Sequence, residues 1–539
     1  MPEEARASMA QMLTYTQPTK SKARSLLLEC AVRALTERRD ESVVVRAGAF
    51  DETFRYSVDC LRQHGVQLPD DSALRAEVVR FEALHGATVA AKRPSDLRVL
   101  YLCGPEPNND LDVLVGLGVA PENIWAVESH AETYRAATDQ LIRTGRFPKV
   151  HRGNTESFFR VVHEQFDFVY FDACGPLLGG QPNTLRSLLA LFEHNRLSPL
   201  SALVTNFAEP SPQAREAYSR SMCAFFAMRY NDCPRALWDA GADPAISMQS
   251  GGDREHLLPY VERNFGATYS DFVTRLVVDV GRQLIPFARA HDIPEVEQQY
   301  FAPREQQQET VRRSGIPMPG PQADETSWRS YFERVFTTTG VVNLIPSSYP
   351  LLHFLEAADR ALLAPFHNYK LSREMLRDAF WSTSLLAQMM NGTADIASPQ
   401  MMAAVRAHWL DNAMNQYFCD IPFPHLMVSC LLGIYGRPYF VNPRRSTRCR
   451  YVAKATPMFA DCLVLDQCRY LFDYFPTIDL VPSRMRSVGF QLVARSCIDQ
   501  IQWHDFSSST RVFDGAALAG MGALPHSKPH DFEDRVVIE

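Results

Sequence analysis

Four residues in the sequence have side chains or backbone suited to binding a nucleoside. Gly104, Glu128 and Asp172 each directly follow a short apolar run, and Asn154 follows a more polar run of the same kind. The runs cover residues 98–103, 123–127, 149–153 and 166–171. A glycine turn lets the backbone pass close to a ligand, and a carboxylate 24 residues further on can accept both hydroxyls of a ribose. The carbonyl of an asparagine side chain can accept the amino hydrogens of an adenine.

These residues need a scaffold that brings them to one place. Between residues 96 and 206 short apolar runs alternate with helical stretches such as 111–117, a pattern that predicts strands and crossover helices of a parallel sheet. A fifth run, 202–205, leads into Asn206. The chemical groups follow the runs, so we expect them at the carboxyl ends of the strands, where open parallel sheets bind ligands.

Over about residues 96–210 the sequence resembles the class I S-adenosylmethionine-dependent methyltransferases. The resemblance implies a doubly wound, mostly parallel α/β sheet and S-adenosyl-L-methionine as cofactor. It places Gly104 near the methionine moiety, Glu128 on the ribose and Asn154 at the adenine. It also implies that Asp172 borders the cofactor and faces the methyl acceptor as the catalytic group.

Two motifs depart from that family's pattern. The first turn reads Cys-Gly-Pro-Glu-Pro-Asn over 103–108, with one glycine where G-x-G-x-G is usual, and Asp-Ala-Cys-Gly-Pro over 172–176 does not identify the acceptor atom. In methyl transfer most catalysis can come from positioning, so Asp172 would either accept a proton from the acceptor or orient an amine. A nicotinamide oxidoreductase typically has the motif G-x-G-x-x-G at the first turn, and this motif is absent there.

Less specific interpretations of the same residues stay open. Asp172 could cap a turn, Glu128 could be a solvated acid at a helix start, and Cys174 is more simply a small buried thiol than a nucleophile. The alternative to an enzyme is a non-catalytic binding or assembly module that has lost or repurposed its cofactor pocket. The unusual Gly-Pro-Glu-Pro turn at 104–107 favours that alternative.

A basic segment lies far from these motifs, at residues 421–460. It contains no Asp or Glu, and tyrosines and phenylalanines are interleaved with its basic residues. Arginine forks bind phosphates and aromatic rings stack on bases, so the segment predicts a contact with nucleic acid, the favoured methyl acceptor. The alternative is a basic seam that pairs with the acidic remainder of the chain. The arginines proposed for nucleic-acid binding are Arg437, Arg444, Arg445, Arg448 and Arg450.

The chain is long enough for several domains. Helical periodicity at 23–35 and 72–84 predicts an N-terminal helical cap, and a polar, Pro- and Gln-rich stretch predicts a linker. We expect a mainly helical C-terminal domain that could dock a protein partner, with clear helical patterns at 349–363 and 401–418. The expected division is 1–95 for the cap, 96–302 for the sheet domain with a helical extension, 303–327 for the linker, 328–519 for the C-terminal domain and 520–539 for a loose tail.

Composition sets outer limits on function. The 539 residues carry a net charge of −7 and are 46% hydrophobic and 22% charged, which excludes wholesale disorder and a globally basic nucleic-acid coat. The 12 cysteines are scattered through the chain, so we expect reduced thiols. The cysteines at 449, 462 and 468 lack the close pairs of structural zinc sites, so we expect no metal. We expect instead a helix over 461–472 that buries its own two thiols. No apolar stretch reaches 18 to 20 residues, and the run 421–436 fits a buried helix, so we expect a cytoplasmic protein without membrane contact.

Overall fold

The computed structural model describes most of the sheet region and parts of the helical regions around it. The ranges described are 17–46, 67–179, 184–227, 254–295, 430–477, 480–484, 487–504 and 532–539, with a few isolated residues and short pieces between them. The predicted helices at 349–363 and 401–418 and most of the predicted linker lie outside these residues. The predicted domain boundaries therefore stay a prediction as a set.

The predicted N-terminal helices form and extend beyond their expected ends. Helix α2 covers Pro18–Thr36, the short α3 covers Arg39–Ser42 and α5 covers Asp71–Thr88. The start of α5 is fixed by Asp70, whose side chain accepts a hydrogen bond of 2.8 Å from the backbone N–H of Ala73.

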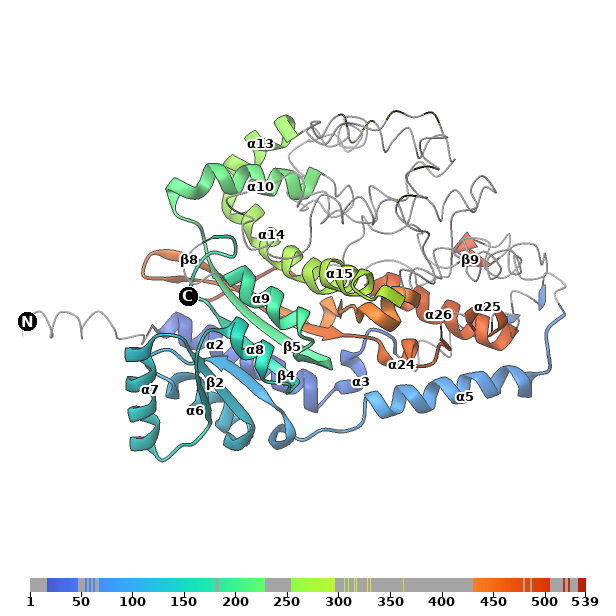
Figure 1. Ribbon diagram of the computed structural model, residues 1–539, viewed down its shortest axis with the longest axis horizontal. Helices are drawn as coiled ribbons and strands as arrows, with labels where there is room; N and C mark the ends of the chain where they lie inside the picture. Colours follow the sequence, from blue (N-terminus) through green and yellow to red (C-terminus); the bar gives the residue numbers. More distant parts are fainter. Residues whose placement is uncertain are drawn as a thin grey trace, which may run out of the picture.

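A single mixed sheet forms the centre of the molecule (Figure 1). Its strands run in the order β11, β7, β8, β5, β4, β1, β2 and β3, and β6 pairs with β8. Strands β1 to β5 are all parallel, as predicted, whereas β8 is antiparallel to β5 and to β7. The bounds are β1 (Val99–Leu102), β2 (Ile124–Glu128), β3 (Lys149–Arg152), β4 (Phe166–Asp172), β5 (Leu197–Ala208), β6 (Phe440–Val441), β7 (Thr447–Ala453), β8 (Thr456–Asp466) and β11 (Val536–Val537).

The direction of winding changes between β1 and β4. From β1 the chain adds β2 and β3 on one side, then crosses back to add β4 and β5 on the other. Crossover helices on opposite faces leave a crevice at such a switch point, beyond the carboxyl ends of the two strands. This crevice is where the residues after β1 and β4 meet.

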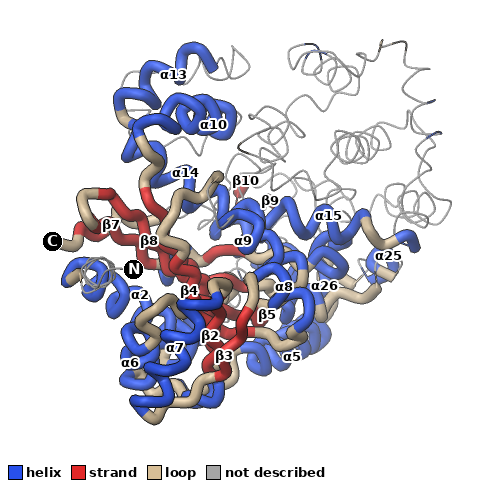
Figure 2. The backbone as a smooth tube through the Cα atoms, turned by 60° about the vertical axis from the view of Figure 1, so that its left-hand side comes forward, coloured by secondary structure: helices blue, strands red, loops and turns tan. Residues whose placement is uncertain are grey.

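Helices cover both faces of the sheet and enclose two hydrophobic cores (Figure 2). Alternate residues of β1 show the division, because Val99 and Tyr101 belong to one core and Leu100 to the other. The first face carries α2, α5, α6 (Asn108–Gly116), α7 (Ala131–Thr144), α24 (Arg469–Phe472) and α26 (Val488–His504). The second carries α8 (Thr155–Val161), α9 (Thr184–Glu193), α10 (Arg215–Ala227), α13 (Arg254–Arg263), α14 (Phe265–Asp279) and α15 (Ile285–His291). The fold is an α/β, doubly wound, mostly parallel sheet with helical flanks.

Two shorter helical stretches and a few small elements complete the described part. A π-helical stretch, η4, joins α14 to α15, and a second, η6, precedes β6. Their bounds are η4 (Val280–Leu284), η6 (Leu432–Gly436), η7 (Pro443–Arg445), α25 (Val481–Arg484), β9 (Ala517–Leu518) and β10 (Gly522–Ala523). No helix among the described residues is long and apolar enough to cross a lipid bilayer.

The predicted helix over 461–472 is wrong for its first half. Residues through Asp466 belong to β8, and Met458–Asp466 of this strand pair with Leu200–Ala208 of β5. From Met458 onward the strand is buried on both faces, so its sequence is mostly apolar without alternation, a pattern that periodicity cannot distinguish from a buried helix. Residues 447–466, expected in a separate helical domain, are therefore part of the central sheet.

The expected loose tail also joins the sheet at its end. Strand β11 pairs in parallel with β7, with Val536 opposite Cys449. The preceding Arg535 is buried, makes an ion pair with Asp461 and donates hydrogen bonds of 2.9 Å to Ser270 O and Thr274 Oγ1. Strand pairing and this ion pair thus anchor residues 532–539. The sequence predicted a loose tail because a polar residue such as Arg535 can belong to a buried ion pair as well as to a solvated segment.

Candidate functional site

A cavity of about 620 Å³ lies at the carboxyl ends of β1 to β4. All four residues singled out in the sequence, Gly104, Glu128, Asn154 and Asp172, line it. Its position is the switch point between β1 and β4, extended along β2 and β3. The structure thus brings the predicted residues together at one edge of the sheet.

The turn after β1 is built with prolines in place of further glycines. Gly104 has φ of +60°, a conformation that favours glycine, and a Cβ atom there would have open space around it. Pro107 is the N-cap of α6 and its carbonyl accepts a hydrogen bond of 3.2 Å from the buried Tyr101 hydroxyl. Glu106 accepts one of 2.8 Å from the Asn109 amide. The atypical turn is therefore ordered by local contacts and leaves the cavity open above Gly104.

Glu128 ends β2 and stands at the mouth of the cavity. Its Oε1 accepts a hydrogen bond of 2.8 Å from the backbone N–H of His130, which fixes the carboxylate. Within the described part of the chain no hydrogen bond engages Oε2, so this oxygen can accept a hydrogen bond from a ligand.

Asn154 lines the cavity but uses its side-chain oxygen locally. Its Oδ1 is the N-cap of α8 and accepts 2.7 Å hydrogen bonds from both the backbone N–H and the hydroxyl of Ser157. A carbonyl oxygen accepts two hydrogen bonds, so the predicted acceptor role toward adenine would require Ser157 to release one. The side-chain NH2 is the group that Asn154 can offer a ligand without disturbing α8.

Asp172, at the end of β4, is the most heavily engaged of the four. Its carboxylate accepts hydrogen bonds from Asn206 at 2.8 Å and from the Cys174 thiol at 3.0 Å, and it lies 2.8 Å from the Lys20 ammonium. Burial pushes the pKa of Asp172 upward, but Lys20 and the hydrogen bonds outweigh it and hold the pKa below its usual value. Asp172 is thus a carboxylate at neutral pH.

The surroundings of Asp172 do not activate the neighbouring thiol. Burial of the sulfur and the charge of Asp172 raise the pKa of Cys174 to about 12, so the thiol is not activated as a nucleophile. The residue as a whole is exposed, so the interpretation of Cys174 as a buried thiol is wrong on that point. Cys174 also has φ of +53°, so the backbone turns sharply just after β4.

Two cations that the sequence analysis missed reach the cavity from helix α2. Lys20 pairs with Asp172, and Arg24 makes an ion pair with the buried Asp110 of α6. Burial raises the pKa of Asp110 to about 7, against the opposing effect of Arg24. A signal was present, because Lys20 and Arg24 are four residues apart and continue the face that carries Leu27. What the sequence could not show is that this face covers the sheet edge.

The arginines of the basic segment separate into two groups. Arg448 is buried and pairs with Asp271 at 2.8 Å, and Arg445 pairs with Glu41 at 3.2 Å. Arg437, Arg444 and Arg450 are exposed. For Arg448 and Arg445 the structure agrees with the alternative of internal pairing, and contact with nucleic acid would require each to leave its carboxylate.

Comparisons with known proteins found partial structural similarities. No family model matches the chain, and no curated protein matches it. An rRNA methylase from Streptococcus thermophilus is 16% identical over 23% of this chain and 69% of its own, with a TM-score of 0.18. An S-adenosylmethionine-dependent methyltransferase from Clostridium acetobutylicum ATCC 824 is 14% identical over 28% of this chain and 55% of its own, also with a TM-score of 0.18.

The chain therefore spans only about half the length of the second structure. The order and the parallel direction of strands β1 to β5 match the expectation for residues 96–210. Residues 96–210 thus have the doubly wound, mostly parallel α/β fold that the sequence resemblance implies.

Proposed function

We propose that the chain binds S-adenosyl-L-methionine in the cavity above β1 to β4 and transfers its methyl group to an acceptor at Asp172. The observation that carries this proposal is a single acidic cavity at the switch point of the sheet, with Glu128 fixed at the end of β2. The cavity volume of about 620 Å³ lies within the range of roughly 300–1,000 Å³ that is common for small-molecule sites.

The residues of the cavity fit a nucleoside with a positive charge. Oε2 of Glu128 would accept a ribose hydroxyl, and the amide of Asn154 would meet the base. Five acidic residues and three basic ones line the cavity, so its charge balance favours a cation. The lining residues with charge are Glu106, Asp110, Glu128, Glu156, Asp172, Lys20, Arg24 and Arg186.

The same charges argue against a dinucleotide. A pyrophosphate binds at a helix N-terminus because the backbone N–H groups there favour an anion. At the start of α6 the carboxylate of Glu106 lines the cavity instead, and it would repel phosphate. This arrangement supports the methyltransferase proposal over a nicotinamide oxidoreductase.

S-adenosyl-L-methionine, when bound, would supply an electrophilic methyl group on a sulfonium. The task of the chain is to hold an acceptor lone pair in line with that group and to keep water out. Asp172 stays ionised and is a weak base because its pKa is lowered by Lys20 and the hydrogen bonds it accepts, against the effect of burial. We therefore infer that Asp172 orients an acceptor N–H or O–H group, from which its carboxylate accepts a hydrogen bond alongside Lys20.

Nucleic acid remains the proposed acceptor class. Its support is the exposed set of Arg437, Arg444 and Arg450, which can bind phosphates. Arg450 precedes Tyr451, whose hydroxyl accepts a 2.8 Å hydrogen bond from the same Asn206 amide that binds Asp172. Strand β7 therefore connects Arg450 to the acceptor side of the cavity.

The cofactor proposal is tested by calorimetric titration of the full chain with S-adenosyl-L-methionine. We expect Glu128→Gln to weaken binding by roughly 10- to 100-fold, because a hydrogen bond to a charged group contributes about 1.5–3 kcal/mol. The matched control is Glu122→Gln, an exposed glutamate before the other end of β2, which should bind like the wild type.

Failure of the folded wild type to bind at millimolar cofactor would contradict the proposal and favour the non-catalytic alternative. Incubation with a methyl-labelled cofactor then tests the acceptor. We expect label in a nucleic-acid pool, and label confined to a protein pool would overturn that part alone.

A further inference from the structure

Two cysteines from distant parts of the chain meet beneath helix α2. Cys30, midway along α2, lies with its Sγ atom 3.0 Å from Oγ1 of Thr447 on β7. Thr447 is paired across the sheet with Cys462 of β8, and Cys30 packs against the hydrophobic core that contains Cys462. Cys462 is fully buried, whereas Cys30 is half-buried. The two cysteines are thus close together in the fold, with Cys30 half-buried and Cys462 inside the core.

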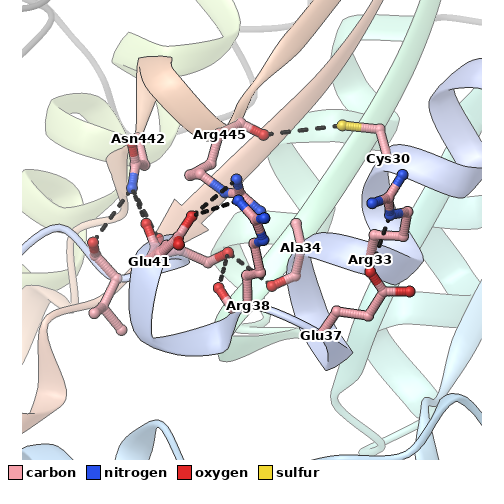
Figure 3. Close-up of polar contacts among 10 residues, drawn as sticks. Cys30, Arg33, Ala34, Glu37, Arg38, Glu41, Asn442 and Arg445 are labelled. Carbon is pink, nitrogen blue, oxygen red and sulfur yellow. Dashed lines mark hydrogen bonds and ion pairs between the residues drawn. The ribbon is translucent and has the colours of Figure 1, made fainter.

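A cavity of about 370 Å³ opens beside Cys30 and gives it access to small solutes. Its walls come from α2 and from the η7 turn, and they carry the guanidinium groups of Arg33, Arg38, Arg444 and Arg445. Figure 3 shows Cys30 directed toward the Arg445 carbonyl, with Arg445 and Arg38 both close to Glu41. The wall is held in place by Asn442, which donates hydrogen bonds of 3.0 Å and 3.2 Å to the carbonyls of Glu41 and Ser42.

These surroundings shift the pKa values of the two thiols in opposite directions. The nearby Cys462 thiol, helped by Thr447 and the charges of Arg445 and Arg33, lowers the pKa of Cys30 to about 6 despite its burial. The interaction with Cys30 and complete burial raise the pKa of Cys462 far above its usual value. At neutral pH the pair is therefore a thiolate at Cys30 beside a protonated thiol at Cys462, which is the arrangement of a reactive cysteine with a resolving partner.

We propose that Cys30 is a site of reversible oxidation by hydrogen peroxide, with Cys462 as its resolving cysteine. The Cys30 sulfur attacks one peroxide oxygen, an S–O bond forms as the O–O bond breaks, and the departing hydroxide takes up a proton to become water. The Cys462 sulfur then attacks the Cys30 sulfur, an S–S bond forms as the S–O bond breaks, and the thiol proton leaves with the hydroxide as a second water. In total two thiols lose two electrons and two protons, and one peroxide is reduced to two water molecules.

The disulfide would join α2 covalently to β8. Helix α2 carries Lys20 and Arg24 into the large cavity, so the bond would hold both cations over the ends of the strands. Oxidation at Cys30 would thus reach the cavity through one rigid helix, whatever ligand the cavity binds.

The selectivity of the reaction is testable because Cys174 offers an internal comparison. Cys174 is the more exposed thiol, but burial of its sulfur and Asp172 raise its pKa to about 12. In the folded full chain at pH 7 we expect iodoacetamide to label Cys30 at least about 100-fold faster than Cys174, measured by mass spectrometry of peptides. Labelling of Cys174 first would overturn the proposal.

Peroxide treatment tests the disulfide itself. We expect a peptide containing Cys30 linked to Cys462 under non-reducing conditions, lost again on addition of a dithiol. In Cys462→Ser the sulfenic acid on Cys30 should persist and be trapped by dimedone, and Cys30→Ser should give neither product. A wild-type chain whose Cys30 stays unmodified by peroxide, or links to another cysteine, would contradict the proposal without bearing on cofactor binding.

Discussion

Two buried carboxylates sit close together at the cavity, and their surroundings push their pKa values in opposite directions. Asp172 has the hydrogen bonds and Lys20, so its pKa is lowered despite burial. Asp110 is buried with a single cation, Arg24, and the charge of Asp172 also acts on it, so its pKa rises to about 7. Neighbouring acids that differ in this way commonly divide their roles, one staying charged and the other exchanging a proton near neutral pH.

The raised pKa of Asp110 predicts a specific dependence of stability on pH. Between the unfolded value near 4 and the folded value of about 7 the folded chain binds a proton more tightly, so this group's contribution to the free energy of unfolding falls as pH rises through that window. Between pH 5 and pH 8 the free energy of unfolding of the wild type should fall by on the order of 2–3 kcal/mol more than that of Asp110→Asn. Urea unfolding of both chains at the two pH values measures the difference, and parallel changes would show that Asp110 does not titrate there.

At the scale of elements, the π-helical stretch η6 (Leu432–Gly436) packs directly against the start of α15. A Cβ atom on Gly436 would lie 2.5 Å from the carbonyl oxygen of Pro286, which belongs to the backbone and cannot rotate away. Gly86, inside α5, has no atom within 4 Å of the same position. The close approach of Pro286 therefore requires glycine at position 436, whereas the space around Gly86 would admit a larger residue.

Replacing each glycine by alanine should have effects of opposite sign. Gly436→Ala should lower the free energy of unfolding by about 1–3 kcal/mol through overpacking against Pro286. Gly86→Ala should raise it by about 0.5–1 kcal/mol because alanine favours a helix interior. Urea midpoints with unchanged slopes would report both effects, and a neutral Gly436→Ala would mean that η6 can shift away from α15.

Elements that a short stretch of sequence identifies could be predicted. Contacts between segments far apart in the sequence could not. The five parallel strands were found from short apolar runs between helical stretches, and their carboxyl ends placed Gly104, Glu128 and Asp172 at one cavity. Nothing local records that β8 pairs with β5 or that α2 delivers Lys20. Asn154 shows a third case, since its residue type served both as a ligand group and as a helix cap, and the structure uses it as the cap.

At the scale of the whole molecule, the sheet is completed by residues from the far end of the chain. Arg535 and Asp461 form an ion pair that is almost entirely buried, next to the pairing of β11 with β7. Removing one member of such a pair leaves the other charged and buried, which costs much more than losing a surface pair.

We expect Arg535→Ala to lower the free energy of unfolding by about 3–5 kcal/mol and to release β11 from the sheet. The double variant Asp461→Asn with Arg535→Met should recover part of that loss because no charge then stays unpaired. Arg450→Ala, an exposed position on β7, should change stability by less than about 0.5 kcal/mol. Urea unfolding and limited proteolysis near residue 535 provide the measurements, and equal stability of Arg535→Ala and wild type would refute the expectation.

The pairing of β5 with β8 has a consequence for synthesis on the ribosome. Leu200 of β5 finds its partner in Asp466, so the long apolar edge of β5 emerges before the strand that will cover it has been made. At about 5–20 residues per second, translation needs roughly 10–50 s to reach β8. During that time the nascent chain presents an open strand edge to other polypeptides, and holdase chaperones that bind extended apolar segments would find their target there.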